Sequence, residues 1–95
     1  MDNIPQFIRT AQDLIETSYP ERAWSTKLPF IMRVFYDDLS DEHMVLLFSE
    51  LTGLDQGTVR NEVYRNAAID LDDPQVVEVR DCLNQFGLQD WIEAD

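Results

Sequence analysis

Two groups of carboxylates are the side chains in this sequence most able to do chemistry. One group lies at residues 37–42 and the other at residues 70–81. No lysine or arginine lies within the first group, and Glu78 and Asp81 of the second would share one face of a helix. Exposed carboxylates of this kind can bind lysine and arginine side chains of another protein. The candidate partner-binding residues are Asp37, Asp38, Asp41 and Glu42 (the first acidic cluster) and Asp70, Asp72, Asp73, Glu78 and Asp81 (the second acidic cluster).

Catalytic side chains are scarce. His43 is the only histidine and Cys82 the only cysteine. No second histidine or asparagine pattern surrounds Cys82 to make it a nucleophile, and the chain has no glycine-rich phosphate loop. We therefore expect no enzymatic activity and no cofactor.

A metal site is also not expected. Residues 70–73 read Asp-Leu-Asp-Asp, but they lack the alternating oxygen ligands, the central glycine and the closing glutamate of a calcium loop. Asp73 precedes Pro74, an arrangement typical of a helix N-cap followed by proline in the first turn. A single cysteine excludes an internal disulfide and a cysteine-based zinc site.

Net charge limits the classes of partner. The chain of 95 residues carries 19 acids and 7 lysines and arginines, for a net charge of −12. The acids and bases balance within residues 1–36, so all of the excess lies in residues 37–95. Such a surface repels phosphate backbones and attracts basic proteins. The alternative that these acids serve only solubility stays open.

Residues 42–66 contain two apolar-periodic segments joined by a short turn. Gly53 permits the turn, Leu54 is expected to plug between the two segments, and Val59 and Val63 are expected to seat the second. The segment resembles a helix-turn-helix, a motif that reads base edges from its second helix. This interpretation assigns alternative nucleic-acid-binding roles to Gln56, Thr58, Arg60, Asn61 and Tyr64.

The charge of this segment opposes direct binding to nucleic acid. A DNA-binding protein contacts phosphates through lysine and arginine. Here Arg60 and Arg65 are outnumbered by acids within residues 42–66, and more acids come just before them. Direct nucleic-acid binding is therefore the weaker interpretation.

A second resemblance lies further along the chain. Residues 69–73 read Ile-Asp-Leu-Asp-Asp, and residues 77–86 read Val-Glu-Val-Arg-Asp-Cys-Leu-Asn-Gln-Phe. Together they resemble the closing stretch of colicin-D-type immunity proteins. That resemblance implies a small acidic helical protein that presents carboxylates to the basic active site of a tRNA-cutting toxin.

Hydrophobic periodicity predicts that the elements carrying these residues are helices. We expect a helix capped by Asn3 that ends at Ser18 or Tyr19, a helical turn around Trp24, and a second helix from residues 26–29 to Tyr36. Three further helices are expected over residues 41–52, about 56–66 and 74–86, with a last short one over residues 88–94. The predicted fold class is all-α: a compact bundle of four to five short helices in a single acidic helical domain, residues 1–95.

The same periodicity selects the core. The expected inner positions are Ile4, Phe7, Ile8, Ala11, Leu14, Ile15, Leu28, Ile31, Met32, Phe35, Met44, Val45, Leu47, Phe48, Leu51, Val59, Val63, Ala67, Val76, Val79, Leu83, Phe86, Leu88, Trp91 and Ile92. Cys82 falls beside this line, which favours a small buried or half-buried thiol.

Function follows from charge more than from any motif. We expect an acidic protein-binding inhibitor that blocks the nucleic-acid-binding surface of a basic partner, such as a nuclease toxin or a defence complex, by charge mimicry. A helix-turn-helix transcription regulator, an adaptor of the transcription machinery, or a structural subunit are the alternatives.

The sequence opens without a secretory signal, and its apolar runs are far shorter than the ~18 residues that cross a bilayer. A cytoplasmic protein without membrane contact is therefore expected.

Overall fold

The computed structural model describes residues 4–94, and within that range every regular element is a helix. The elements are α1 (Gln6–Ser18), the 3-10 helix η1 (Ala23–Lys27), α2 (Leu28–Tyr36), α3 (Asp41–Thr52), α4 (Gln56–Asn66), α5 (Pro74–Gln85) and α6 (Leu88–Glu93). The all-α prediction is confirmed. The described residues form six α-helices rather than the predicted four to five. The sixth is α6, the last short helix expected over residues 88–94, which follows Gly87 with φ of 111°.

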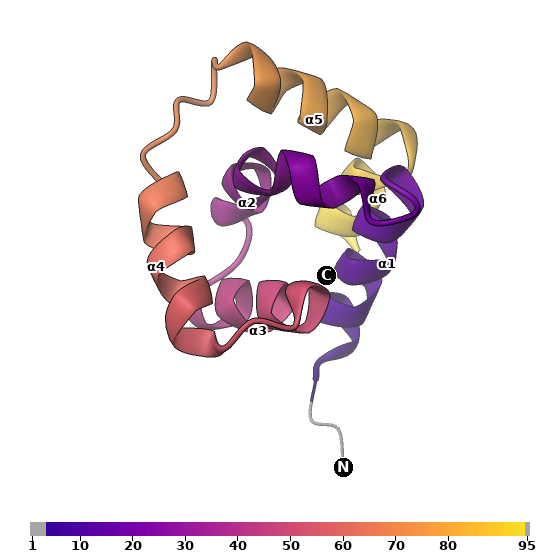
Figure 1. The fold of residues 1–95 in the computed structure, drawn as a ribbon. Coiled ribbons are helices and arrows are strands. Elements are labelled where there is room, and N and C mark those ends of the chain that lie inside the picture. Colours follow the sequence, from indigo (N-terminus) through magenta and orange to yellow (C-terminus); the bar gives the residue numbers. More distant parts are fainter. Residues whose placement is uncertain (1–3, 95) are drawn as a thin grey trace.

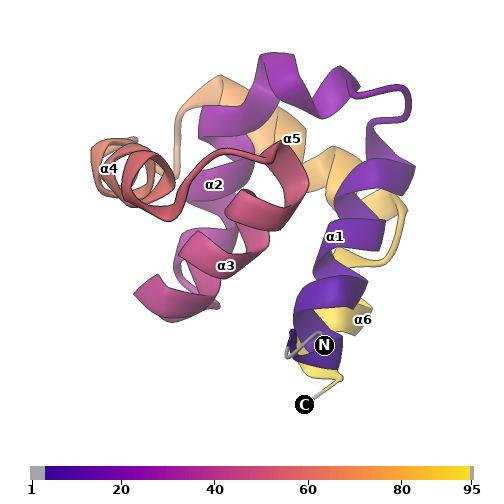
Figure 2. The same ribbon diagram turned by 60° about the horizontal axis from the view of Figure 1, so that its bottom comes forward.

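The helices are arranged around α2. Figure 1 shows α2 in the middle, with α3, α4 and α5 around it and α1 on the far side from α4. In both views α6 lies beside α1, so the last helix packs against the first (Figure 2). The core contains Phe35 and Phe48, which are fully buried with ring centroids 6.5 Å apart. α2 is therefore the central helix of the bundle.

Side-chain caps fix the ends of three helices where the sequence predicts them. The Ser40 side chain accepts a hydrogen bond from the His43 N–H at the start of α3, and Asp73 accepts one from the Gln75 N–H at the start of α5. Asp55 accepts from both the hydroxyl and the N–H of Thr58, at 2.7 Å and 3.0 Å. These bonds hold the pKa of Asp55 below its ordinary value, because they stabilise the carboxylate.

The C-terminal end of α1 and the connector after it agree with the prediction. α1 ends at Ser18, as expected before Pro20. Its first helical residue is Gln6, with Pro5 at the N-cap position; the predicted cap Asn3 lies outside the described residues. The expected turn around Trp24 is η1, which buries the Trp24 side chain.

Three predicted core positions are wrong. Phe7 is 42% exposed, Leu54 49% and Phe86 49%. Phe7 lies at the edge of the buried stripe of α1, Leu54 lies in the α3–α4 turn rather than between the helices, and Phe86 follows the last turn of α5. No later element buries these side chains fully, so apolar periodicity overestimates the width of the buried face.

The single cysteine is half-buried, as predicted. The Cys82 thiol donates a weak hydrogen bond to the Ser18 carbonyl over 3.8 Å, which joins α5 to the end of α1. Burial, followed by the neighbouring Cys82, raises the pKa of the Tyr19 phenol. No helix within residues 4–94 combines the length and the apolar character needed to cross a membrane.

Candidate functional site

The first acidic cluster lies in the α2–α3 turn and the first turn of α3. All four of its residues are exposed. Asp41 and Glu42 lie at the N-terminal end of α3, where the helix dipole favours negative charge. No lysine or arginine lies within this cluster in the sequence, but the fold brings two arginines to it. The Arg33 Nη1 atom lies 3.4 Å from the Asp37 carboxylate, and the positive charge of Arg80 in α5 lowers the pKa of Asp38.

The surroundings of Asp38 raise the pKa of its carboxyl group above the ordinary value. Partial burial raises the pKa of Asp38, the neighbouring carboxylate of Asp37 raises it further, and Arg80 lowers it. The charged form of Asp38 is therefore disfavoured in the folded protein relative to the unfolded chain.

We expect the substitution Asp38→Asn to stabilise the fold slightly at neutral pH, by no more than about 0.5 kcal/mol for so exposed a site. The raised pKa means that the folded state holds the Asp38 proton more tightly than the unfolded state, so this carboxyl costs stability as pH rises through that window. Below the ordinary aspartate pKa of about 4, the Asp38 carboxyl is neutral in both the folded and the unfolded state, so the stability gain from Asp38→Asn disappears. Thermal unfolding of both proteins at pH 7 and pH 3 measures this difference; a destabilised variant at pH 7 would contradict it.

The second acidic cluster occupies the α4–α5 loop and the exposed side of α5. Asp70, Asp72 and Asp81 are exposed and Asp73 is half-buried at the α5 cap. Glu78 lies 3.5 Å from the Lys27 ammonium, a contact between two partly exposed side chains. The Asp73 carboxylate thus caps α5, and Lys27 partly neutralises the charge of Glu78.

Arg33 connects the two clusters. Its Nε–H donates a 2.7 Å hydrogen bond to the Ile69 carbonyl, directly before Asp70, while its Nη1 atom approaches Asp37. The Arg33 side chain is only 12% exposed and also lies over the Tyr36 ring. One guanidinium therefore holds the turn of the first cluster and the loop of the second in a fixed relation.

A groove of about 1080 Å³ opens between α1, the α2–α3 turn and the segment that contains α6. We call it the acidic groove. Of the residues that the structure describes, four carboxylates line it, Asp13, Asp37, Asp38 and Asp90, and no lysine or arginine does. The rest of its lining combines polar side chains, such as Gln6, Thr10 and Thr17, with apolar ones that include Trp91 and the exposed rings of Phe7 and Phe86.

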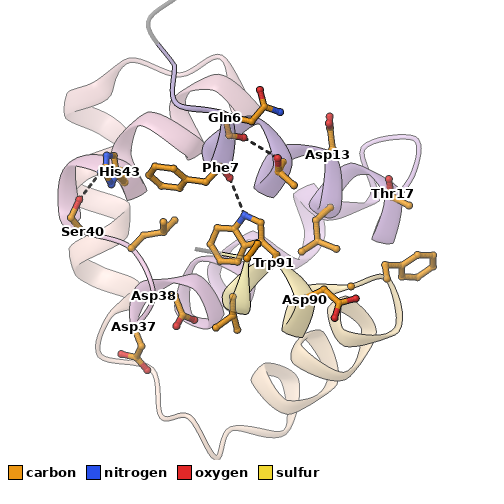
Figure 3. A pocket seen from close by; sticks show the side chains of 17 residues that line it. Gln6, Phe7, Asp13, Thr17, Asp37, Asp38, Ser40, His43, Asp90 and Trp91 are labelled. Atoms are coloured by element: carbon orange, nitrogen blue, oxygen red, sulfur yellow. Dashed lines mark hydrogen bonds between the residues drawn. The ribbon is translucent and has the colours of Figure 1, made fainter.

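Hydrogen bonds and ring contacts fix the floor of the groove. The Trp91 indole N–H donates to the Phe7 carbonyl at 2.9 Å, and the Trp91 ring meets Phe35 edge to face at 5.1 Å. The Phe7 ring packs edge to face against His43 at 4.8 Å. Figure 3 shows Trp91 in the centre, with Asp37 and Asp38 on one side and Asp13 and Asp90 on the other.

The sequence analysis missed part of this site. Asp13 lies in the charge-balanced part of the sequence and Asp90 stands apart from both clusters, so neither was selected. Only Asp37 and Asp38 of the predicted partner-binding residues line the groove. The hydrophobic periodicity of the first helix does not predict that Phe7 is exposed or that it lies opposite Trp91.

α3 and α4 are the two helices of the segment that resembles a helix-turn-helix. α3 and α4 pack together through a turn in which Gly53 has φ of 77°. Gln56, Asn61 and Tyr64 are exposed on α4. The hydroxyl of Thr58 is used by the cap at Asp55, and Arg60 is half-buried beside a second depression that Glu42 also lines.

No family model matches the chain, and neither a curated protein nor a solved structure does. Among residues 4–94, no group of three or more histidine, cysteine, aspartate or glutamate side chains is placed to hold a metal ion. The candidate site therefore consists of the two exposed acidic clusters and the acidic groove.

Proposed function

We propose that this protein is an acidic inhibitor that occupies the nucleic-acid-binding surface of a basic partner in the cytoplasm. Its carboxylates take the place of phosphates. The partner is a nuclease or another protein that holds nucleic acid with lysine and arginine. The resemblance of residues 69–86 to colicin-D-type immunity proteins supports the same class of partner.

One observation carries this proposal: eight of the nine residues in the two acidic clusters are exposed. Among the ion pairs of the described residues, only those of Asp37 with Arg33 and Glu78 with Lys27 involve these carboxylates. Asp41, Glu42, Asp70, Asp72 and Asp81 are exposed and belong to no ion pair among residues 4–94, so they are available to a basic surface. An ordered set of carboxylates that is only partly neutralised suits competition with a phosphate backbone.

The proposed mechanism has two stages. The long-range field of the negative surface first speeds the encounter with a positive one, an effect that salt screens over about 10 Å at 0.1 M. Carboxylates then form charge-assisted hydrogen bonds to arginine and lysine, and these are stronger than bonds between neutral groups. No chemical step is required, because occupancy alone excludes nucleic acid.

The test uses the tagged full chain to capture a partner from the cells that carry its gene. The purified partner is then assayed for nucleic-acid binding with and without an equimolar amount of the chain. We expect the chain to displace nucleic acid. Changing Asp37, Asp38 and Asp41 together to asparagine, or neutralising Asp70, Asp72, Glu78 and Asp81, should slow association about tenfold or more at low salt.

A matched control separates local charge from total charge. Changing Glu16, Glu21 and Glu50 to glutamine also removes three negative charges, as many as the Asp37, Asp38 and Asp41 variant loses, but from positions outside both clusters. Melting curves of all variants exclude unfolding as the cause of lost binding. Unchanged association rates in both cluster variants, or an undisturbed partner–nucleic acid complex, would contradict the proposal.

The alternative function places α4 on nucleic acid as a helix-turn-helix regulator or an adaptor. The exposed Gln56, Asn61 and Tyr64 favour it, since glutamine and asparagine can read adenine edges. The same protein preparation decides between the two: retardation of double-stranded DNA by the chain alone, abolished by Asn61→Ala, would support this alternative.

A further inference from the structure

The acidic groove combines an apolar floor with charged edges. Trp91 and the half-exposed ring of Phe7 supply apolar surface, while the carboxylates lie on two opposite sides of it (Figure 3). A purely apolar ligand would leave these carboxylates partly desolvated and unpaired, which is unfavourable. A phosphate-bearing ligand would be repelled by them. The chemistry that satisfies both parts is cationic and apolar together.

We propose that the acidic groove binds an extended basic segment of a protein partner, in which arginines alternate with apolar side chains. This inference rests on the proposed function and names the groove as the place where the partner inserts. Arginine fits better than lysine, because its planar guanidinium pairs with two carboxylate oxygens at once and also stacks on aromatic rings. The exposed faces of Phe7 and Phe86 offer such rings.

The size of the groove agrees with a segment rather than a single side chain. Its volume of about 1080 Å³ slightly exceeds the roughly 300–1,000 Å³ that encloses drug-sized ligands. Asp37 and Asp38 lie together on one side of Trp91, and Asp13 and Asp90 lie apart from each other on the opposite side, so carboxylates are available at both edges of the groove (Figure 3). A segment with one arginine on each side of an apolar residue would place the apolar side chain over Trp91 and an arginine at each acidic edge of the groove.

The floor is already in place before a ligand arrives. The hydrogen bond from Trp91 to the Phe7 carbonyl and the packing of Trp91 on Phe35 hold the indole in one orientation. On the other side, His43 holds Phe7, and its own backbone N–H is fixed by Ser40. A preformed floor lowers the entropy lost on binding, which favours a short segment as ligand.

The test measures binding of a short blocked peptide of alternating arginine and leucine, labelled with a fluorophore, by anisotropy at physiological salt. The groove variant carries Asp13→Asn and Asp90→Asn, two exposed residues outside both acidic clusters. The control variant carries Glu16→Gln and Glu50→Gln, which change the net charge equally. We expect the groove variant to bind about tenfold more weakly, about one unit of log Kd, and the control variant less than threefold more weakly.

Two further comparisons test the chemistry. Replacing arginine by lysine in the peptide should weaken binding, and so should the protein change Phe86→Ala, because each removes a stacking partner. Equal weakening by the groove and control variants, or no binding of the peptide, would overturn the inference. Since Asp13 and Asp90 belong to neither cluster, that failure would leave the cluster experiment, and with it the proposed function, standing.

Discussion

Replacing Phe48 by alanine is expected to lower the free energy of unfolding by about 3–5 kcal/mol, the usual cost of removing a buried phenylalanine ring. The Phe48 side chain is fully buried and meets Phe35 at 70° between ring planes, with 6.5 Å between centroids. The substitution therefore loses transfer free energy, a ring contact and the packing around the cavity that it leaves.

Urea denaturation followed by circular dichroism measures this loss. Glu50→Ala is the control, because Glu50 lies two residues further along α3 but is exposed. The control should change stability by no more than about 0.5 kcal/mol. A loss of less than about 1 kcal/mol for Phe48→Ala would mean that α3 does not present this face to the core.

The second large effect is expected at Arg33. Changing Arg33 to methionine should cost about 2–3 kcal/mol, because the Ile69 carbonyl loses a hydrogen bond from a charged donor. That bond is 2.7 Å long and the Arg33 side chain is 12% exposed, so water replaces it poorly. The ion pair with Asp37 adds less, since the Asp37 side chain is 54% exposed.

Arg65→Met provides the comparison. Arg65 also pairs with a glutamate, Glu62, at 3.1 Å, but its side chain is 72% exposed, and its loss should cost at most about 1 kcal/mol. Amide hydrogen exchange gives a second measurement: Arg33→Met should speed exchange in the α4–α5 loop that follows Ile69. Equal stability losses for the two variants would contradict the role given to Arg33.

Local signals account for the parts of the fold that the sequence predicts well. Ser40, Asp55 and Asp73 each cap the helix that follows them, through bonds to residues two or three positions ahead. Such bonds depend on the neighbouring residues alone, so helix boundaries can be derived without knowing the tertiary structure. Gly53 and Pro20 act in the same local way.

The candidate site is less predictable because its parts are distant in the sequence. The bond from Trp91 to Phe7 spans 84 positions, and that from Arg33 to Ile69 spans 36. No periodic pattern encodes which two helix edges will face each other across a groove. Residue type located the two acidic clusters, but the position of Asp13 opposite Asp37 and the exposure of Phe7 depend on how α1, α3 and α6 pack.

The contact between Trp91 and Phe7 has a consequence for the order of folding. A chain made from its N-terminus can bury most of α1 through α5 before residues 88–93 are available, whereas one wall of the groove needs α6 to close a loop of 84 positions. Because α5 already packs against α1, α6 reaches Phe7 through the short connection at Gly87 once the other helices are in place, and the remaining entropic cost of closure is small. The acidic groove is therefore complete only after α6 has docked, and we expect a protease cut near Gly87 to remove its Trp91 floor.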